Sequence, residues 1–161
     1  ENIIEHNEEK QEVAVVEEIP LEPVRKEVYR NLTIEELGAK IDRILSSTIS
    51  GKGTLIAEYS LAQGVDPYIA TAIIMHETGC TWGCSSLVRK CNNVGGQKGS
   101  GCNGYQAYRT LDEGIQGLIN NLAKNYFAMG LVTPETINKK YAENPNWYVS
   151  IYNYIVKIEQ I

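Results

Sequence analysis

Apolar side chains recur every three or four residues in several segments of the chain, and this period predicts helices. The most apolar of these segments lies between Asp66 and Gly79. Asp66 offers a side-chain oxygen that caps free backbone amides, Pro67 fixes the first helical φ, and Gly79 closes a helix in the left-handed conformation. Because the sequence between these signals is apolar on almost every side, we predict a buried central helix.

The same period and the signals for helix starts predict further helices around the central one. These helices are expected to begin at Thr33, Thr54, Ser85, Thr110, Thr133 and Asn146. The first and the longest of them open on capping boxes, Thr33 with Glu36 and Thr110 with Glu113. Gly130 is expected to close the helix that Thr110 starts.

Residues 92–109 have no helical period and are rich in Gly, Asn and Tyr. Gly99-Ser-Gly101, between two segments of mixed polarity, predicts the turn of an irregular β-hairpin. The whole pattern predicts a mainly α fold of the α+β type, with one small hairpin beside the buried central helix.

Acidic residues are concentrated at the start of the chain. Residues 1–28 carry nine Glu and three basic residues, a net charge of −6, which leaves +1 for residues 29–161. Glu-rich sequence with Pro20 and Pro23 predicts a linker or stalk before one domain at 29–161. A chain that begins at Glu1 without Met has the form of a trimmed segment, so we expect this part to join a membrane anchor or a larger assembly. No apolar run of the sequence is long enough to span a bilayer.

Four cysteines fall within 23 residues: Cys80, Cys84, Cys91 and Cys102. An even number at close spacing favours two disulfides and an oxidising compartment, so an extracellular or cell-envelope location is expected. A four-cysteine zinc site is the alternative, although these spacings lack the C-x2-C pairs typical of such sites. Pairing Cys80 with Cys84 and Cys91 with Cys102 would keep both loops local.

Glu77 lies in the last turn of the central helix and projects from its apolar face. Burial and the negative end of the helix dipole both favour the protonated form of a carboxyl group, which a general acid requires. The alternative is a side chain that reaches solvent at a frayed helix end.

His76-Glu77 resembles the start of the zinc motif H-E-x-x-H. The position of the second histidine is occupied by Cys80, however, and the only other histidine of the chain is His6. We therefore predict no metal and no cofactor.

The segment after Glu77 has the composition of a sugar-binding surface. It holds no Asp or Glu before Asp112, although basic residues are present. Amide and aromatic side chains bond hydroxyl and acetamido groups and stack on pyranose rings. The candidate substrate-binding residues are Asn92, Asn93, Gln97, Tyr105 and Tyr108, with Trp82 as a further aromatic. A domain charge of +1 gives no basic stripe, so nucleic acid is not an expected partner.

Several short motifs resemble the bacterial glucosaminidases of the lysozyme-like superfamily, over roughly Leu55 to Ile158. The motifs are Met75-His-Glu-Thr-Gly79, Ser85-Ser86-Leu, Asn92-Asn-Val-Gly-Gly96, Tyr108-Arg-Thr-Leu-Asp-Glu-Gly-Ile115, Tyr141 and Trp147. The resemblance implies a lysozyme-like fold and an enzyme that cleaves peptidoglycan glycan strands with Glu77 as its acid. We expect the protein to be a monomer. It also implies that Tyr141 faces the cleft; a core aromatic on a helix is the alternative.

The predicted hairpin departs from this family because it has no second carboxylate. Two-carboxylate glycosidases need an acid and a base or nucleophile at set separations. Here the partner of Glu77 would have to be Asp112, Glu113 or Glu143, or a group of the substrate itself. Catalysis with help from the substrate is the mechanism attributed to the related lytic transglycosylases. Two hypotheses follow: a glycosidase, with a preference for transglycosylation, or a non-catalytic peptidoglycan-binding or structural module of a cell-envelope or phage-tail assembly.

Overall fold

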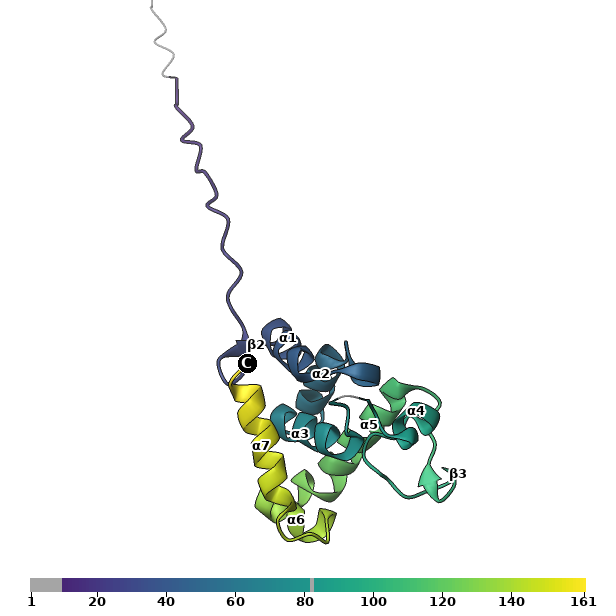
Figure 1. The fold of residues 1–161 in the computed structure, drawn as a ribbon. Coiled ribbons are helices and arrows are strands. Elements are labelled where there is room, and N and C mark those ends of the chain that lie inside the picture. The colour runs from purple at the N-terminus through teal and green to yellow at the C-terminus, as the bar shows by residue number, and fades with distance from the viewer. Residues whose placement is uncertain (1–9, 82) are drawn as a thin grey trace, which may run out of the picture.

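The structure is a computed structural model that describes residues 10–81 and 83–161 (Figure 1). In these residues seven α-helices, two short 3-10 helices and two antiparallel strand pairs form a mainly α fold of the α+β type, as predicted. The helices are α1 Ile34–Ile44, α2 Gly53–Ala62, α3 Pro67–Thr78, α4 Ser86–Cys91, α5 Leu111–Asn125, α6 Pro134–Tyr141 and α7 Trp147–Glu159. The strands are β1 Glu27–Tyr29, β2 Leu32–Thr33, β3 Gly101–Cys102 and β4 Tyr105–Gln106. No helix in the described part of the chain is both long and apolar enough to cross a membrane.

Helix α3 is the predicted central helix. The Asp66 carboxylate accepts hydrogen bonds from the backbone N–H of Tyr68 at 2.8 Å and of Ile69 at 3.2 Å, and Gly79 ends the helix at φ 60°. Every side chain from Pro67 to Met75 is buried. Helices α2 and α7 pack against α3, and Figure 1 shows α3 in the middle of the helical body. The C-terminal end of α3 is therefore fixed in space by its neighbours.

Residues 10–26 have no regular secondary structure and extend away from the helices (Figure 1). Strand β1 begins at Glu27 and therefore crosses the predicted boundary between the linker, which ends at residue 28, and the domain, which begins at residue 29. The pairing of β1 with β2 was not predicted. Arg25 joins this segment to the domain, because its guanidinium donates to the Glu36 carboxylate at 2.5 Å. Glu36 also completes the predicted capping box with Thr33.

The β3–β4 hairpin forms beside α4, but its turn differs from the prediction. The turn residues are Asn103 and Gly104, with φ values of 50° and 85°, and not Gly99-Ser-Gly101. Asn-Gly is the residue pair that two-residue hairpin turns favour, since both positions need positive φ. Gly101 instead lies in β3.

Helix α5 also differs in two details from the prediction. It ends at Asn125, and Gly130 closes a separate 3-10 helix at Phe127–Met129. Only half of the predicted capping box forms: the Thr110 hydroxyl accepts from the Glu113 backbone N–H at 3.1 Å. The Glu113 carboxylate bonds Arg109 at 2.9 Å.

Candidate active site

Glu77 is half-buried in the last turn of α3 and contacts the start of α7. The indole N–H of Trp147 donates a hydrogen bond to Glu77 Oε1 at 3.3 Å. Within the described residues, no Lys, Arg or His nitrogen forms a salt bridge with this carboxylate. The second carboxylate oxygen, Oε2, faces the backbone of Gly96, since a methyl group added there would lie 3.9 Å from it. Glu77 thus has one oxygen held by a neutral donor and lies without an ion-pair partner.

The carboxylate opens into a groove of about 440 Å³, which we call the Glu77 groove. Four parts of the chain supply its walls: the end of α3, the turn before the hairpin, α5 with the residue that follows it, and the end of α6. The lining residues are Glu77, Gly95, Gly96, Gln97, Lys98, Asn121, Tyr126, Tyr141 and Ala142. The groove therefore combines one acid with amides and aromatic rings, which is a surface suited to a sugar chain.

An aromatic cluster forms one wall of the Glu77 groove. The Tyr141 ring stacks on Trp147 with centroids 5.0 Å apart and lies 5.6 Å from the Tyr126 ring. The Tyr141 hydroxyl donates to the carbonyl of Gly95 at 3.2 Å. Burial, together with the nearby Glu77 carboxylate, raises the pKa of Tyr141 far above its ordinary value, so this phenol stays protonated and remains a donor.

Another wall is a tight turn that Asn93 organises. Its side chain is buried, donates to the carbonyls of Gln97 and Gln106 at 2.9 Å each, and accepts from the N–H groups of Gly95 and Gln97 at 3.3 and 3.2 Å. Gly96 has a φ of 63°, a conformation that residues with a Cβ rarely adopt. Asn93 thus shapes the groove, because its side chain bonds the backbone of the turn and of strand β4.

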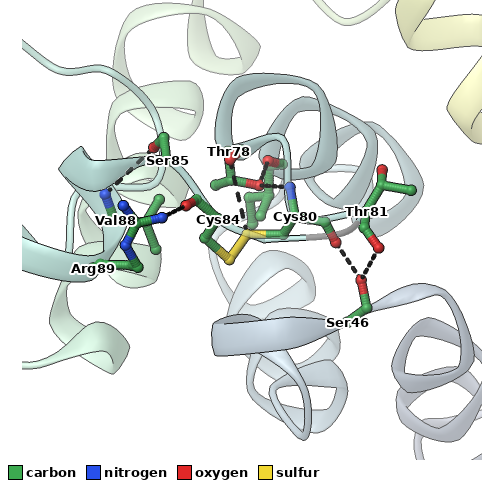
Figure 2. Close-up of a disulfide and its surroundings, with 9 residues drawn as sticks. Ser46, Thr78, Cys80, Thr81, Cys84, Ser85, Val88 and Arg89 are labelled. Carbon is green, nitrogen blue, oxygen red and sulfur yellow. Dashed lines mark hydrogen bonds between the residues drawn. A yellow bond between two sulfur atoms is a disulfide. The ribbon is translucent and has the colours of Figure 1, made fainter.

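Two local disulfides, Cys80–Cys84 and Cys91–Cys102, are present. The first follows Glu77 directly and lies in the network drawn in Figure 2. There the Ser46 hydroxyl donates to the carbonyl of Cys80, and the Thr78 hydroxyl donates to a carbonyl of α3 at 2.6 Å. These contacts attach the end of α3, and Glu77 with it, to the segment that follows α1.

The other predicted binding residues divide into three groups. Gln97 lines the Glu77 groove, but its side-chain amide donates to the Gly117 carbonyl at 3.2 Å and its oxygen accepts from the Tyr108 hydroxyl. Asn92 donates to the Tyr108 carbonyl at 3.0 Å. Tyr105 lines a different hollow. The structure therefore brings Gln97 and Tyr141 together with Glu77, whereas Asn92, Asn93 and Tyr108 support the turn.

Trp82 and His6 lie outside the described residues, so their predicted roles have no structural outcome. His76 lies edge-on to the rings of Trp147 and Tyr154, with centroids 6.3 and 6.2 Å away. Within residues 10–81 and 83–161, no three His, Cys, Asp or Glu side chains gather as a metal-binding group.

Glu77 is the only acid among the described residues that line the groove. Of the three candidates for a second carboxylate, Asp112 pairs with Lys52 at 2.7 Å and Glu113 with Arg109. Glu143 lies in a neighbouring hollow beyond Ala142. Among the described residues, the groove thus offers one carboxyl group.

Two polar residues of the groove escaped the sequence analysis. Asn121 comes from α5, and Lys98 comes from the segment before the hairpin. Asn121 is a polar position on a helix whose other face is apolar, and such positions are usually solvated. Only the packing of α5 against the turn shows that this one lines the groove.

Comparisons with known proteins rest on the fold alone. No family model and no curated protein sequence matches the chain. Among solved structures, the crystal structure of autolysin E from S. aureus is similar, with a TM-score of 0.63 and 16% sequence identity. The match covers 80% of this chain and 66% of the autolysin chain, so this chain spans just under two thirds of that structure. The protein thus shares its overall fold with autolysin E.

Proposed function

We propose that the protein cleaves β-1,4-glycosidic bonds of peptidoglycan glycan strands, with Glu77 as general acid and then general base. The observation that carries this proposal is the half-buried Glu77 carboxylate, bonded to an indole N–H, in a groove of about 440 Å³ lined by amides and tyrosines. The fold shared with a protein named as an autolysin supports a cell-wall substrate.

The reaction follows from having one acid in the groove. Glu77 would give its proton to the glycosidic oxygen as the bond from that oxygen to C1 breaks. The 2-acetamido group of the sugar would stabilise the positive charge that develops at C1. The Glu77 carboxylate would then take a proton from the sugar's own 6-hydroxyl while that oxygen bonds to C1, which gives a 1,6-anhydro end. In hydrolysis, water would supply the oxygen and the proton instead.

The groove geometry favours transglycosylation over hydrolysis. An inverting enzyme needs a second carboxylate to activate water, and a retaining one needs a carboxylate nucleophile near the acid. Neither is supplied by the described residues that line the groove. Mass spectrometry of digested cell wall separates the two reactions, since a 1,6-anhydro terminus supports transglycosylation and a free reducing end contradicts it.

The central test is the variant Glu77→Gln. It is expected to lower the rate of wall clearing by about 10²–10⁴-fold, the usual contribution of a general acid, while its thermal melting stays close to that of the unchanged protein. Glu143→Gln is the matched control and should clear walls at nearly the normal rate. Clearing by E77Q would refute the assignment of the acid, and binding to insoluble peptidoglycan without any clearing by the unchanged protein would favour a non-catalytic module.

The proposed setting is the cell envelope or the extracellular space, with the protein as a monomer. Two disulfides in one small domain support an oxidising compartment. The extended residues 10–26 would act as a spacer between the domain and whatever it is attached to, an anchor or a larger assembly.

A further inference from the structure

A second hollow, of about 310 Å³, lies between α4 and the β3–β4 hairpin. Its apolar walls are Leu87, the Cys91–Cys102 disulfide and the ring of Tyr105, and Lys90 is its basic residue. We call this hollow the hairpin pocket. Its lining also includes the hydroxyl of Ser86 and the amide of Asn103, which can bond peptide groups.

The hairpin pocket adjoins the Glu77 groove at one pair of side chains. Lys98 lines the groove and Tyr105 lines the pocket. The two residues face each other across an antiparallel bridge, and the Lys98 ammonium lies 4.0 Å from the centroid of the Tyr105 ring. A substrate that fills the groove therefore passes close to the mouth of the pocket.

This junction is positively charged. Lys90 and Lys98 are both exposed, and within the described residues neither ammonium lies in a salt bridge. The sequence has no Asp or Glu between Glu77 and Asp112, so acidic neighbours from the same stretch cannot neutralise them. Two exposed cations outside any salt bridge of the described residues, beside an apolar hollow, are a surface that attracts an anionic ligand with small apolar groups.

We propose that the hairpin pocket binds the peptide branch of the glycan strand that lies in the Glu77 groove, with Lys90 and Lys98 binding its carboxylates. This inference rests on the proposed function. Peptidoglycan strands carry short peptides on their muramic acid residues, and these peptides have free carboxylate groups. Their methyl side chains fit the apolar wall of Leu87 and the disulfide. The pocket would make the protein prefer strands that carry peptides over bare ones.

Binding measurements on a Glu77→Gln background test this, because the strands then stay intact. Two ligands are compared by calorimetric titration: soluble glycan strands that carry their peptides, and the same strands after an amidase has removed the peptides. Anionic phosphate-containing polymers attached to the strands are removed from both samples first. We expect about fivefold tighter binding of the peptide-bearing strands, the effect of two exposed ion pairs. Adding Lys90→Gln and Lys98→Gln should make the two strands bind with nearly equal affinity. The affinity for the peptide-bearing strands should then also depend less on salt.

Lys26→Gln is the matched control, since Lys26 is an exposed lysine in the N-terminal segment, and it should keep the preference. Equal binding of both strands by the protein with Lys90 and Lys98 intact would overturn the inference while the proposed function stands. A preference that survives in the double variant would also overturn it. Binding of neither strand would overturn the proposed function and this inference together.

Discussion

Tyr141 and Tyr126 are neighbouring tyrosines of the Glu77 groove whose hydroxyl groups differ in their partners. The Tyr141 hydroxyl donates a hydrogen bond to the carbonyl of Gly95. The next residue, Gly96, faces Glu77. Among the described residues the Tyr126 hydroxyl has no hydrogen-bond partner. The two rings are otherwise similar, because both pack in the same aromatic cluster.

The variant Tyr141→Phe is therefore expected to lower kcat about tenfold, since the Gly95-Gly96 wall loses the bond that positions it against Glu77. Its free energy of unfolding should fall by only about 1 kcal/mol, the usual net contribution of one hydrogen bond. Steady-state turnover of soluble glycan fragments and denaturant melts measure the two effects. Tyr126→Phe should lose much less activity, and an equal loss in both variants would contradict this role for the Tyr141 hydroxyl.

Single residues were predictable where their position along a helix decides their environment. The half-buried environment of Glu77 could be predicted because the residue lies on an apolar helix with clear start and stop signals. The roles of Asn92 and Asn93 did not follow, because an amide in a Gly-rich segment can bind a ligand or its own backbone. Asn93 bonds backbone groups of its own chain, and only the folded turn shows which carbonyl and N–H groups its side chain can reach.

At the scale of elements, local signals predicted helix starts better than turns and helix ends. Thr33, Asp66, Thr110 and Thr133 all cap helices, because a capping bond involves residues only two or three positions apart. The end of α5 was placed five residues too late, since Tyr126 leaves the helical conformation to enter the aromatic cluster. Tertiary packing, which no local pattern contains, decided that boundary.

The start of α1 provides a pH-dependent element. The hydrogen bond from Arg25, followed by that from the Thr33 backbone, lowers the pKa of Glu36 from its ordinary value of 4.5 to about 2. A carboxyl group whose pKa is lower in the folded state stabilises the fold at pH values above its unfolded pKa. That stabilisation is lost as the pH falls from about 4.5 through about 2.

Glu36→Gln keeps a side chain that completes a capping box and removes only the charge. Its melting temperature should be slightly below that of the unchanged protein at pH 7, and the difference should shrink as the pH falls and vanish below about pH 2. Thermal melts by circular dichroism over this pH range measure the difference. A gap between the two proteins that persists at the lowest pH would mean that the charge of Glu36 is not its source.

At the scale of the whole molecule, the fold class was predictable and the groove was not. Helical periods and caps specify seven helices in the described residues and the burial of α3. The Glu77 groove, in contrast, is assembled from segments between residue 77 and residue 142 that meet only after packing. Its aromatic side comes from Tyr126 and Tyr141, and Trp147 stacks on Tyr141. The apolar spacing of Tyr126 and Trp147 predicted helix faces but not which faces meet.

The distribution of charge over the chain gives a last prediction. Residues 1–22 contain eight Glu and one Lys, a net charge of −7, so their removal leaves a domain of +2. The large apolar side chains described in this segment are more than 80% exposed, from Val16 at 82% to Leu21 at 96%. Deleting residues 1–22 should therefore leave the melting temperature within about 1 °C of the full chain, because the described part of the segment, residues 10–22, buries little surface. Pro23 to Lys26 are kept so that Arg25 still pairs with Glu36.

The same deletion should strengthen binding to the anionic wall, since the acidic segment no longer repels it. On an E77Q background, sedimentation with insoluble peptidoglycan should show tighter binding by the truncated chain at low ionic strength. The gain should disappear at about 1 M salt, where charges more than about 3 Å apart are screened. A gain that is independent of salt would point to steric blocking by the segment, and an unchanged affinity at every salt concentration would mean that its charge does not act on the groove.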